Sequence, residues 1–244
     1  MRHNRYTPLI VVLALAALAR SASAQTVNTE FPPLFPFVIS FDAPDNITNI
    51  SKQIDAPAGK DGFVRVKDGH FVTDKGPIRF WGTNLCFMAN FPSKEQADKL
   101  AARLARFGYN CVRLHHMDTG NNSIVSGQQT LTELDRQKLD ALDYMIAAFK
   151  KHGIYVNINL HVGRWLDDRD GFPFREQRPG YDKGVGNFEP RMIELQKKYA
   201  RDLLTHINPY TTLFRSAGLM IVTVSRFVNS APVTIKASGI SNLV

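Results

Sequence analysis

The chain has 244 residues, of which 44% are hydrophobic and 21% charged, and it carries two cysteines and a formal charge of +8. These fractions exclude a disordered or collagen-like chain, and two cysteines exclude a scaffold held by several disulfides. The length is below that of most complete α/β barrels.

The excess positive charge lies mainly at the two ends of the chain. Residues 1–24 and residues 209–244 each hold three basic and no acidic residues, which leaves 24 basic and 22 acidic residues between them. A phosphate-binding groove needs basic residues clustered on a folded surface. We therefore expect no nucleic-acid partner.

The first 24 residues have the three parts of a secretory signal peptide. Two arginines precede an apolar stretch over 8–19, and residues 22–24, Ala-Ser-Ala, supply a small-residue cleavage site. The apolar stretch is too short for a membrane span, which takes about 20 residues. We expect cleavage before Gln25 and an exported protein, periplasmic or extracellular, with no membrane contact after cleavage.

The C-terminal segment differs from the rest of the chain. Residues 209–216, Pro-Tyr-Thr-Thr-Leu-Phe-Arg-Ser, match the in-frame translation of the end of a common sequencing adaptor. No acid follows Asp202, and β-branched runs such as 221–224 appear. We expect that the native reading frame is lost near Pro209 and that 209–244 is an adaptor-derived or foreign tail. The alternative is a native β-rich C-terminus.

The first elements expected after the signal are strands. Residues 25–60, rich in Pro, Asn and Asp, are interpreted as an irregular extension with one short strand at 37–41. From 63 to 72, apolar and polar residues alternate around Asp68-Gly69, the strongest short signal of a β-hairpin. A turn at 74–77 and a strand over 78–86 follow, and Trp81 is expected to face the helices and join the core.

Three strand–helix units come next. Ser93 and Gln96 have the spacing of a capping box, and the helix that they begin ends at Gly108. The remaining elements are expected in the order strand 110–117, helix 134–151, strand 154–162 and helix 190–207. This alternation indicates parallel strands, in an open doubly wound sheet or a (β/α)8 barrel. No glycine-rich phosphate loop follows the first strand, which disfavours a dinucleotide-binding fold.

Polar residues interrupt these strands, although parallel strands are usually apolar on both faces. If the apolar faces contact the helices, four polar side chains point inward near the carboxyl ends of the strands, where barrel enzymes place their active sites. They are Asn84, Arg113, His115 and His161. The alternative is an internal hydrogen-bonded network without a catalytic role, since an unpartnered buried arginine is very costly.

Neighbouring residues add weaker signals. His115 and His116 are adjacent in a strand and are expected to face opposite sides, and neither H-x-H nor H-E-x-x-H occurs, so we expect no metal and no cofactor. Trp165, in the loop after His161, is a candidate for stacking on a sugar ring or for packing within its own loop.

Acids and cysteines also lie near the strand ends. Asp118 and the acids at 167, 168 and 170 could serve as catalytic carboxylates, but loop acids are more often solvated. Cys86 closes one strand and Cys111 begins the next, so both thiols are expected to be buried and too far apart for a disulfide.

Three segments resemble glycoside hydrolase family 5, the cellulase-like (β/α)8 barrels. They are Phe80-Trp81-Gly82-Thr83-Asn84, residues 110–118 (Asn-Cys-Val-Arg-Leu-His-His-Met-Asp) and Asn159-Leu160-His161. The resemblance implies a TIM-barrel domain over 61–208, truncated to about its first three βα units. It also implies that Arg113 orients and charge-tunes the nucleophile, and that His161 either hydrogen-bonds a substrate hydroxyl or supports the same network as Arg113. The remaining support and substrate-binding residues would be His115, His116, Asn84 and Trp165.

The resemblance ends before the family's two catalytic glutamates, which follow the fourth and seventh barrel strands. Retaining glycosidases need two carboxyls about 5 Å apart, and neither is assigned in this chain. We expect a fragment of an exported retaining glycoside hydrolase acting on a polysaccharide or oligosaccharide, with the chain itself inactive. The alternatives are a non-catalytic carbohydrate-binding barrel and, less favoured, a metal-dependent hydrolase barrel.

Overall fold

The computed structural model describes residues 44–119, 123–125, 133–164, 170–172, 185–211, 213–214 and 220–223. The expected signal peptide, the expected strand at 37–41 and Trp165 lie outside these residues. Within the described ranges, no helix is both long enough and apolar enough to cross a membrane. The described strands form three sheets, of which the four-stranded parallel one carries the candidate site.

A small antiparallel sheet precedes the parallel one. It consists of β1 (Arg65–Lys67), β2 (His70–Thr73) and β3 (Gly76–Pro77), in that order. Asp68 and Gly69 join β1 to β2 with φ angles of 51° and 76°, the left-handed pair that a type I′ turn requires. The hairpin expected from Asp-Gly is confirmed.

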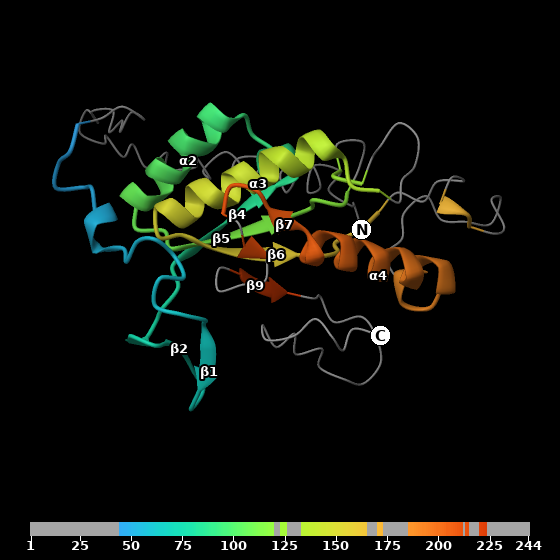
Figure 1. The fold of residues 1–244 in the computed structure, drawn as a ribbon, viewed down its shortest axis with the longest axis horizontal. Coiled ribbons are helices and arrows are strands. Elements are labelled where there is room, and N and C mark those ends of the chain that lie inside the picture. Colours follow the sequence, from blue (N-terminus) through green and yellow to red (C-terminus); the bar gives the residue numbers. More distant parts are fainter. Residues whose placement is uncertain are drawn as a thin grey trace, which may run out of the picture. The chain divides into compact units, whose positions relative to one another are not determined.

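Four parallel strands form the second sheet in the order β4-β5-β6-β9 (Figure 1). Their bounds are β4 Gly82–Cys86, β5 Cys111–His115, β6 Tyr155–Asn159 and β9 Met220–Thr223. The strand expected over 78–86 is shorter in the structure. Its first residue, Ile78, bonds to the hairpin instead, through its backbone N–H to the carbonyl of Phe71.

The helices α2 (Lys94–Arg106) and α3 (Arg136–Lys151) lie side by side over one face of this sheet (Figure 1). The expected capping box begins α2: the Ser93 hydroxyl accepts the Gln96 N–H, and the Gln96 side chain accepts the Ser93 N–H. Apolar residues of both helices and of β5 and β6 form the main core, among them Ala101, Leu104, Met145, Ile146, Phe149, Val112, Leu114, Val156 and Ile158.

The described part of the N-terminal extension packs against the ends of these two helices. It contains one short 3-10 helix, η1 (Ser51–Gln53). The Ile50 N–H donates to the carbonyl of Arg106, at the end of α2, and the Ala58 N–H donates to the carbonyl of Lys150 in α3. These bonds hold the extension against the C-terminal ends of the two helices.

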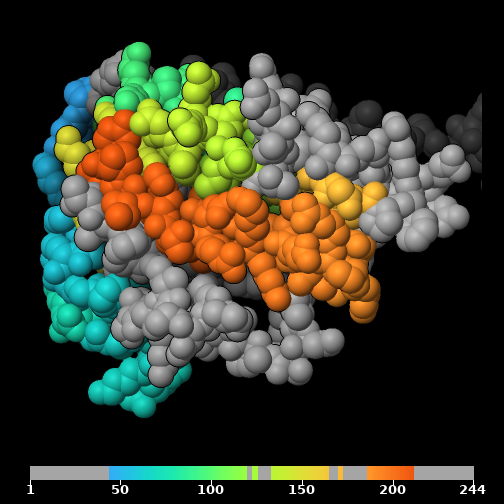
Figure 2. Space-filling view, turned by 45° about the vertical axis from the view of Figure 1, so that its right-hand side comes forward, coloured from blue at the N-terminus to red at the C-terminus, as the bar shows by residue number. Residues whose placement is uncertain are grey.

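The helix α4 (Pro190–Thr205) follows β6, and residues 206–211 then run back along α3 (Figure 2). Two side-chain contacts hold this return: His206 Nε2 lies 2.6 Å from Asp143 Oδ2, and the Tyr210 hydroxyl donates to Asp140 Oδ1 at 2.6 Å. The strands β7 (Ile207–Asn208) and β8 (Leu213–Phe214) pair antiparallel.

The fourth parallel strand comes from the segment interpreted above as a foreign tail. β9 pairs with β6, with Met220 opposite Val156 and Thr223 opposite Asn159. The sheet therefore has one parallel strand more than the three expected. Unpaired backbone groups at an open sheet edge can pair with a β-branched segment of any origin, and residues 221–223 are all β-branched. The assignment of 209–244 to a tail stays a prediction.

Candidate functional site

One face of the parallel sheet carries polar side chains, and those of neighbouring strands lie opposite one another. Asn84 of β4 lies opposite Arg113 of β5, and Arg113 lies opposite Asn157 of β6. The alternate residues Val112 and Leu114 are fully buried in the core beneath the helices. Because successive side chains of a strand point to opposite faces, the prediction that Asn84 and Arg113 share the face away from the helices is confirmed.

Two buried donors belong to this part of the sheet. Nε of Arg113 and Nδ2 of Asn159 are buried and have no hydrogen-bond partner among the described residues. Leaving a buried donor unsatisfied costs about 1–3 kcal/mol, so such groups are uncommon in folded proteins. An acceptor such as a carboxylate or a sugar hydroxyl would satisfy them.

His115 ends β5 and is held from two sides. Its Nδ1 lies 3.2 Å from Oδ1 of Asn159, on the neighbouring strand. Its carbonyl accepts a 2.7 Å hydrogen bond from the side chain of Asn90. Asn90 is fully buried and belongs to the short 3-10 helix η2 (Phe87–Asn90), which follows β4. The carboxyl end of β5 is thereby tied to β6 on one side and to the segment that follows β4 on the other.

His116 lies next to His115 and does not face the opposite side of the sheet. Its φ is 55°, in the left-handed region, so the alternation of the strand stops at His115. The two imidazole rings meet edge to face with centroids 4.3 Å apart, and the His116 ring also stacks on Phe87 at 4.5 Å. The expectation of opposite faces is wrong because β5 ends at His115, two residues before the expected end of the strand at 117.

His161 follows β6 and is bound to an acid that follows β5. Its Nδ1 lies 2.5 Å from Oδ2 of Asp118, and Oδ1 of Asp118 accepts the backbone N–H of Val162 at 3.3 Å. Asp118 is only 2% exposed, so the expectation of a solvated loop acid is wrong for this residue. The left-handed turn at His116 directs the chain toward the end of β6. Asp170, another of these acids, is also buried.

Three polar residues of this region, Asn90, Thr119 and Asn159, were not assigned to the site by sequence reasoning, and Asp118 was considered only as one of several loop acids. The Thr119 hydroxyl lies 3.2 Å from Nδ1 of His116. The signal that could have found Asp118 is its place just after a parallel strand, since the carboxyl ends of parallel strands meet at one edge of a sheet. Asn90 carries no such signal, because its partner is a backbone carbonyl 25 positions away.

Trp81 and the cysteines lie differently from what the sequence predicts. Trp81 is 65% exposed rather than buried, because it precedes β4 and stacks on Tyr109 with ring centroids 6.1 Å apart. The two cysteines are unpaired, as expected, but only partly buried. Cys111 lies opposite Gly82 at one end of the β4–β5 pair, and burial raises the pKa of its thiol to about 11.

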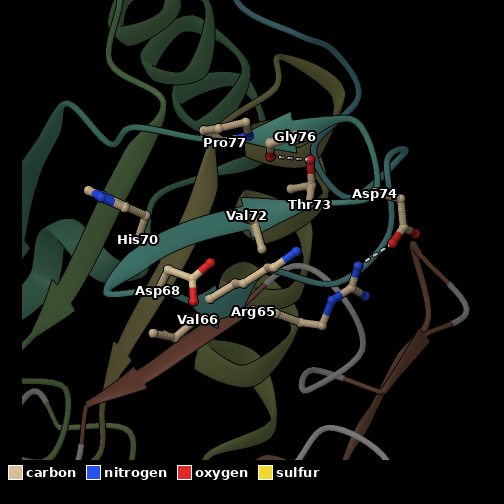
Figure 3. Close-up of a pocket in the computed structure, with 10 residues that line it drawn as sticks. Arg65, Val66, Asp68, His70, Val72, Thr73, Asp74, Gly76 and Pro77 are labelled. Carbon is tan, nitrogen blue, oxygen red and sulfur yellow. Dashed lines mark hydrogen bonds and ion pairs between the residues drawn. The ribbon is translucent and has the colours of Figure 1, made fainter.

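A hollow of about 690 Å³ lies elsewhere, on the antiparallel sheet (Figure 3). Arg65 forms an ion pair with Asp74 there, and the Thr73 hydroxyl donates to the carbonyl of Gly76 at 3.3 Å. None of the polar residues at the strand ends lines it. Among the described residues, no group of three or more His, Cys, Asp or Glu side chains could hold a metal ion.

The sequence profile of the family described as Cellulase (glycosyl hydrolase family 5) matches residues 73–199, more than half of the chain. The chain belongs to glycosyl hydrolase family 5. The family 5 match runs from β2 into α4, so it includes Asn84, Arg113, Asp118 and His161. A search of the curated proteins found no match.

Solved structures show the same fold as this family 5 chain. The endo-1,4-beta-mannanase from Rhizomucor miehei has 15% identity and a TM-score of 0.50, and the alignment covers 70% of this chain and 49% of that one. For a family 5 mannosidase variant from the same organism, in complex with mannosyl-fructose, the values are 12%, 0.52, 69% and 48%. The chain thus spans about half the length of these structures. The fold is that of a TIM barrel, of which the described residues form part.

Proposed function

We propose that this family 5 chain comes from an exported retaining glycoside hydrolase that cleaves a β-linked polysaccharide. The acid/base and nucleophilic glutamates would lie beyond this chain, after later barrel strands. The residues at the carboxyl ends of β4, β5 and β6 would support the nucleophile and bind the substrate. The chain alone is then inactive.

The observation that carries this proposal is the place of Arg113. It stands between Asn84 and Asn157 on the inward face of the sheet, with a buried Nε that lacks a partner among the described residues. A retaining mechanism needs one ionised carboxylate and one protonated carboxyl about 5 Å apart. A guanidinium beside the nucleophile favours its ionised form and orients it through a planar pair of donors.

The imidazoles provide the sugar-binding part of the proposal. His115 ends β5, His116 follows it and His161 follows β6, so the three imidazoles belong to the carboxyl ends of neighbouring strands. Ring nitrogens suit the donors and acceptors of sugar hydroxyls. Trp165, which lies outside the described residues, is assigned to stacking on the apolar face of a sugar ring. Because the similar structures carry the names mannanase and mannosidase, β-mannan is the first polysaccharide to test.

We further propose that residues 1–24 are removed on export and that 209–244 derive from adaptor or foreign DNA. N-terminal sequencing of the secreted protein would then begin at Gln25. Direct sequencing of the gene, without assembly, would show a different reading frame from about codon 209 onward. An unbroken native gene that encodes 209–244 would contradict the second part.

The enzymatic test compares this chain with the product of the contiguous native gene. Release of reducing sugar is measured on β-mannan, cellulose and xylan. We expect hydrolysis of at least one of them by the longer protein and none by the chain. Arg113→Ala in the longer protein should lower kcat/KM by about 10²–10³-fold, as loss of a pre-organised electrostatic contact does. Arg65→Ala, which removes an exposed arginine of the hairpin, is the matched control.

The alternatives give different results in the same assay. Binding of a glycan without turnover by the longer protein would support a non-catalytic carbohydrate-binding barrel. Turnover that a chelator abolishes would support a metal-dependent hydrolase. Hydrolysis by the chain itself would contradict the placement of both glutamates beyond it.

A further inference from the structure

We infer that Asp118 is a positioning residue that holds His161 in its Nδ1–H tautomer, so that Nε2 is the ring atom that accepts a hydrogen bond from a sugar hydroxyl. That a sugar hydroxyl is the partner of Nε2 rests on the proposed function. That Asp118 selects the tautomer of His161 rests on the geometry of the two side chains.

The first step concerns the protons around the Asp118 carboxylate. Three groups lie within hydrogen-bond distance of its two oxygens: Nδ1 of His161 at 2.5 Å, the backbone N–H of Val162 at 3.3 Å and, at 3.5 Å, the hydroxyl of Thr119. The backbone group can only donate, and an ionised carboxylate can only accept. A carboxylate buried to this degree needs such donors to offset its lost hydration. Nδ1 of His161 therefore carries the proton.

The second step concerns what keeps Asp118 in place. The Thr119 hydroxyl lies 2.5 Å from the carbonyl of Gly163 and 3.2 Å from Nδ1 of His116. Because a hydroxyl has one proton, it donates to the carbonyl and accepts from the imidazole. The segment after β5 is thus tied to the segment after β6 at two successive residues, Asp118 and Thr119.

The third step concerns the ring nitrogen on the far side from Asp118. In a neutral imidazole one nitrogen donates and the other accepts. With the proton on Nδ1, the lone pair is on Nε2, which can accept a hydroxyl proton. The opposite tautomer would present a donor there. Asp118 thus selects the direction of the hydrogen bond between His161 and the sugar.

The test reads the tautomer directly and uses no glycan. Long-range 1H–15N spectra of the 15N-histidine-labelled chain are recorded at a pH of about 8, where an ordinary imidazole with a pKa of about 6.5 is neutral. His161→Gln identifies the signals of this ring. We expect a protonated Nδ1 and an unprotonated Nε2 in the wild-type protein.

Asp118→Asn should invert this pattern. The amide Oδ1 can still accept the Val162 N–H, while Nδ2 donates to the ring and makes Nδ1 the acceptor. We expect the proton to move to Nε2 in the folded variant. The control is Asp140→Asn, which removes an exposed carboxylate of α3 that accepts a hydrogen bond from Tyr210. It should leave the His161 signals unchanged.

Two results would overturn the inference. One is a wild-type spectrum in which His161 carries its proton on Nε2. This measurement does not depend on Asp118→Asn, so it tests the inference even if that variant does not fold. The other is an unchanged Nδ1–H ring in folded Asp118→Asn, with folding judged from the dispersion of the backbone amide signals. Either result leaves the proposed hydrolase function intact, and failure of the polysaccharide assay leaves the tautomer result intact.

Discussion

The side chain of Asn110 accepts the backbone N–H of Trp81 at 2.7 Å, across 29 positions of the chain. Its Nδ2 also donates to the carbonyl of Arg79 at 2.8 Å. The first ladder pair of β4 and β5 is Gly82 with Cys111. One amide side chain therefore extends the pairing of these two strands beyond the end of the regular ladder.

Asn110→Ala should lower the free energy of unfolding by about 1–3 kcal/mol, because it leaves a backbone donor and a backbone acceptor unpaired. Urea unfolding followed by circular dichroism measures this change. Asn84→Ala is the control. Asn84 is exposed and its side chain makes a weak contact with the sulfur of Cys86 at 3.9 Å, so we expect a change in the free energy of unfolding within about 0.5 kcal/mol. Equal effects of the two substitutions would contradict the bridging role of Asn110.

Gly153 and Gly69 have nearly the same backbone conformation, with φ angles of 78° and 76°, but different surroundings. A Cβ on Gly153 would lie 2.5 Å from the carbonyl oxygen of Asp55, whereas a Cβ on Gly69 would meet nothing within 4 Å. Gly69→Ala should cost about 1–2 kcal/mol through the left-handed backbone alone. Gly153→Ala should cost at least about 1 kcal/mol more, through the clash.

Thermal and urea unfolding of the two glycine variants check this difference. If Gly153→Ala is as stable as Gly69→Ala, the backbone of the N-terminal extension at Asp55 can move away from the added methyl group at little cost in free energy. That result would mean that residues 44–60 do not pack tightly against the end of α3.

The Ser93 hydroxyl satisfies the Gln96 N–H at the start of α2. Ser93→Ala should lower stability by about 1 kcal/mol, the usual effect of losing an N-cap. Ser93→Asp keeps an acceptor at the cap and should remain within about 0.5 kcal/mol of the wild type. Differential scanning calorimetry separates these values, and a neutral Ser93→Ala would contradict a role of the cap in stability.

The raised pKa of Cys111, about 11 because of burial, predicts slow alkylation in the folded protein. At pH 8 a thiol of this pKa is about 0.1% thiolate, and the reactive fraction rises about tenfold per pH unit until the pH nears the pKa. Iodoacetamide labelling of a Cys86→Ser variant, followed by mass spectrometry, isolates Cys111. We expect labelling to be much slower in the native protein than in urea. Similar rates in both would show that this thiol is not buried.

Local sequence patterns are sufficient for most of the helices and turns because those features depend on residues a few positions apart. Asp68-Gly69 predicts the hairpin through the φ angles that its turn requires, and Ser93 with Gln96 predicts the start of α2 through hydrogen bonds between near neighbours. Alternation along β5 likewise predicts that Arg113 shares a face with Asn84, because the period of a strand is two.

The sequence by itself therefore determined the family, the alternation of parallel strands and helices, and the face that carries Arg113. Only the tertiary structure decided that Asp118 is buried against His161, that His116 contacts His115, that Trp81 is exposed and that a fourth strand joins the sheet. These features depend on groups brought together from distant positions, 43 apart for Asp118 and His161. A local pattern contains no information on which distant partner will satisfy a given donor, acceptor or open edge.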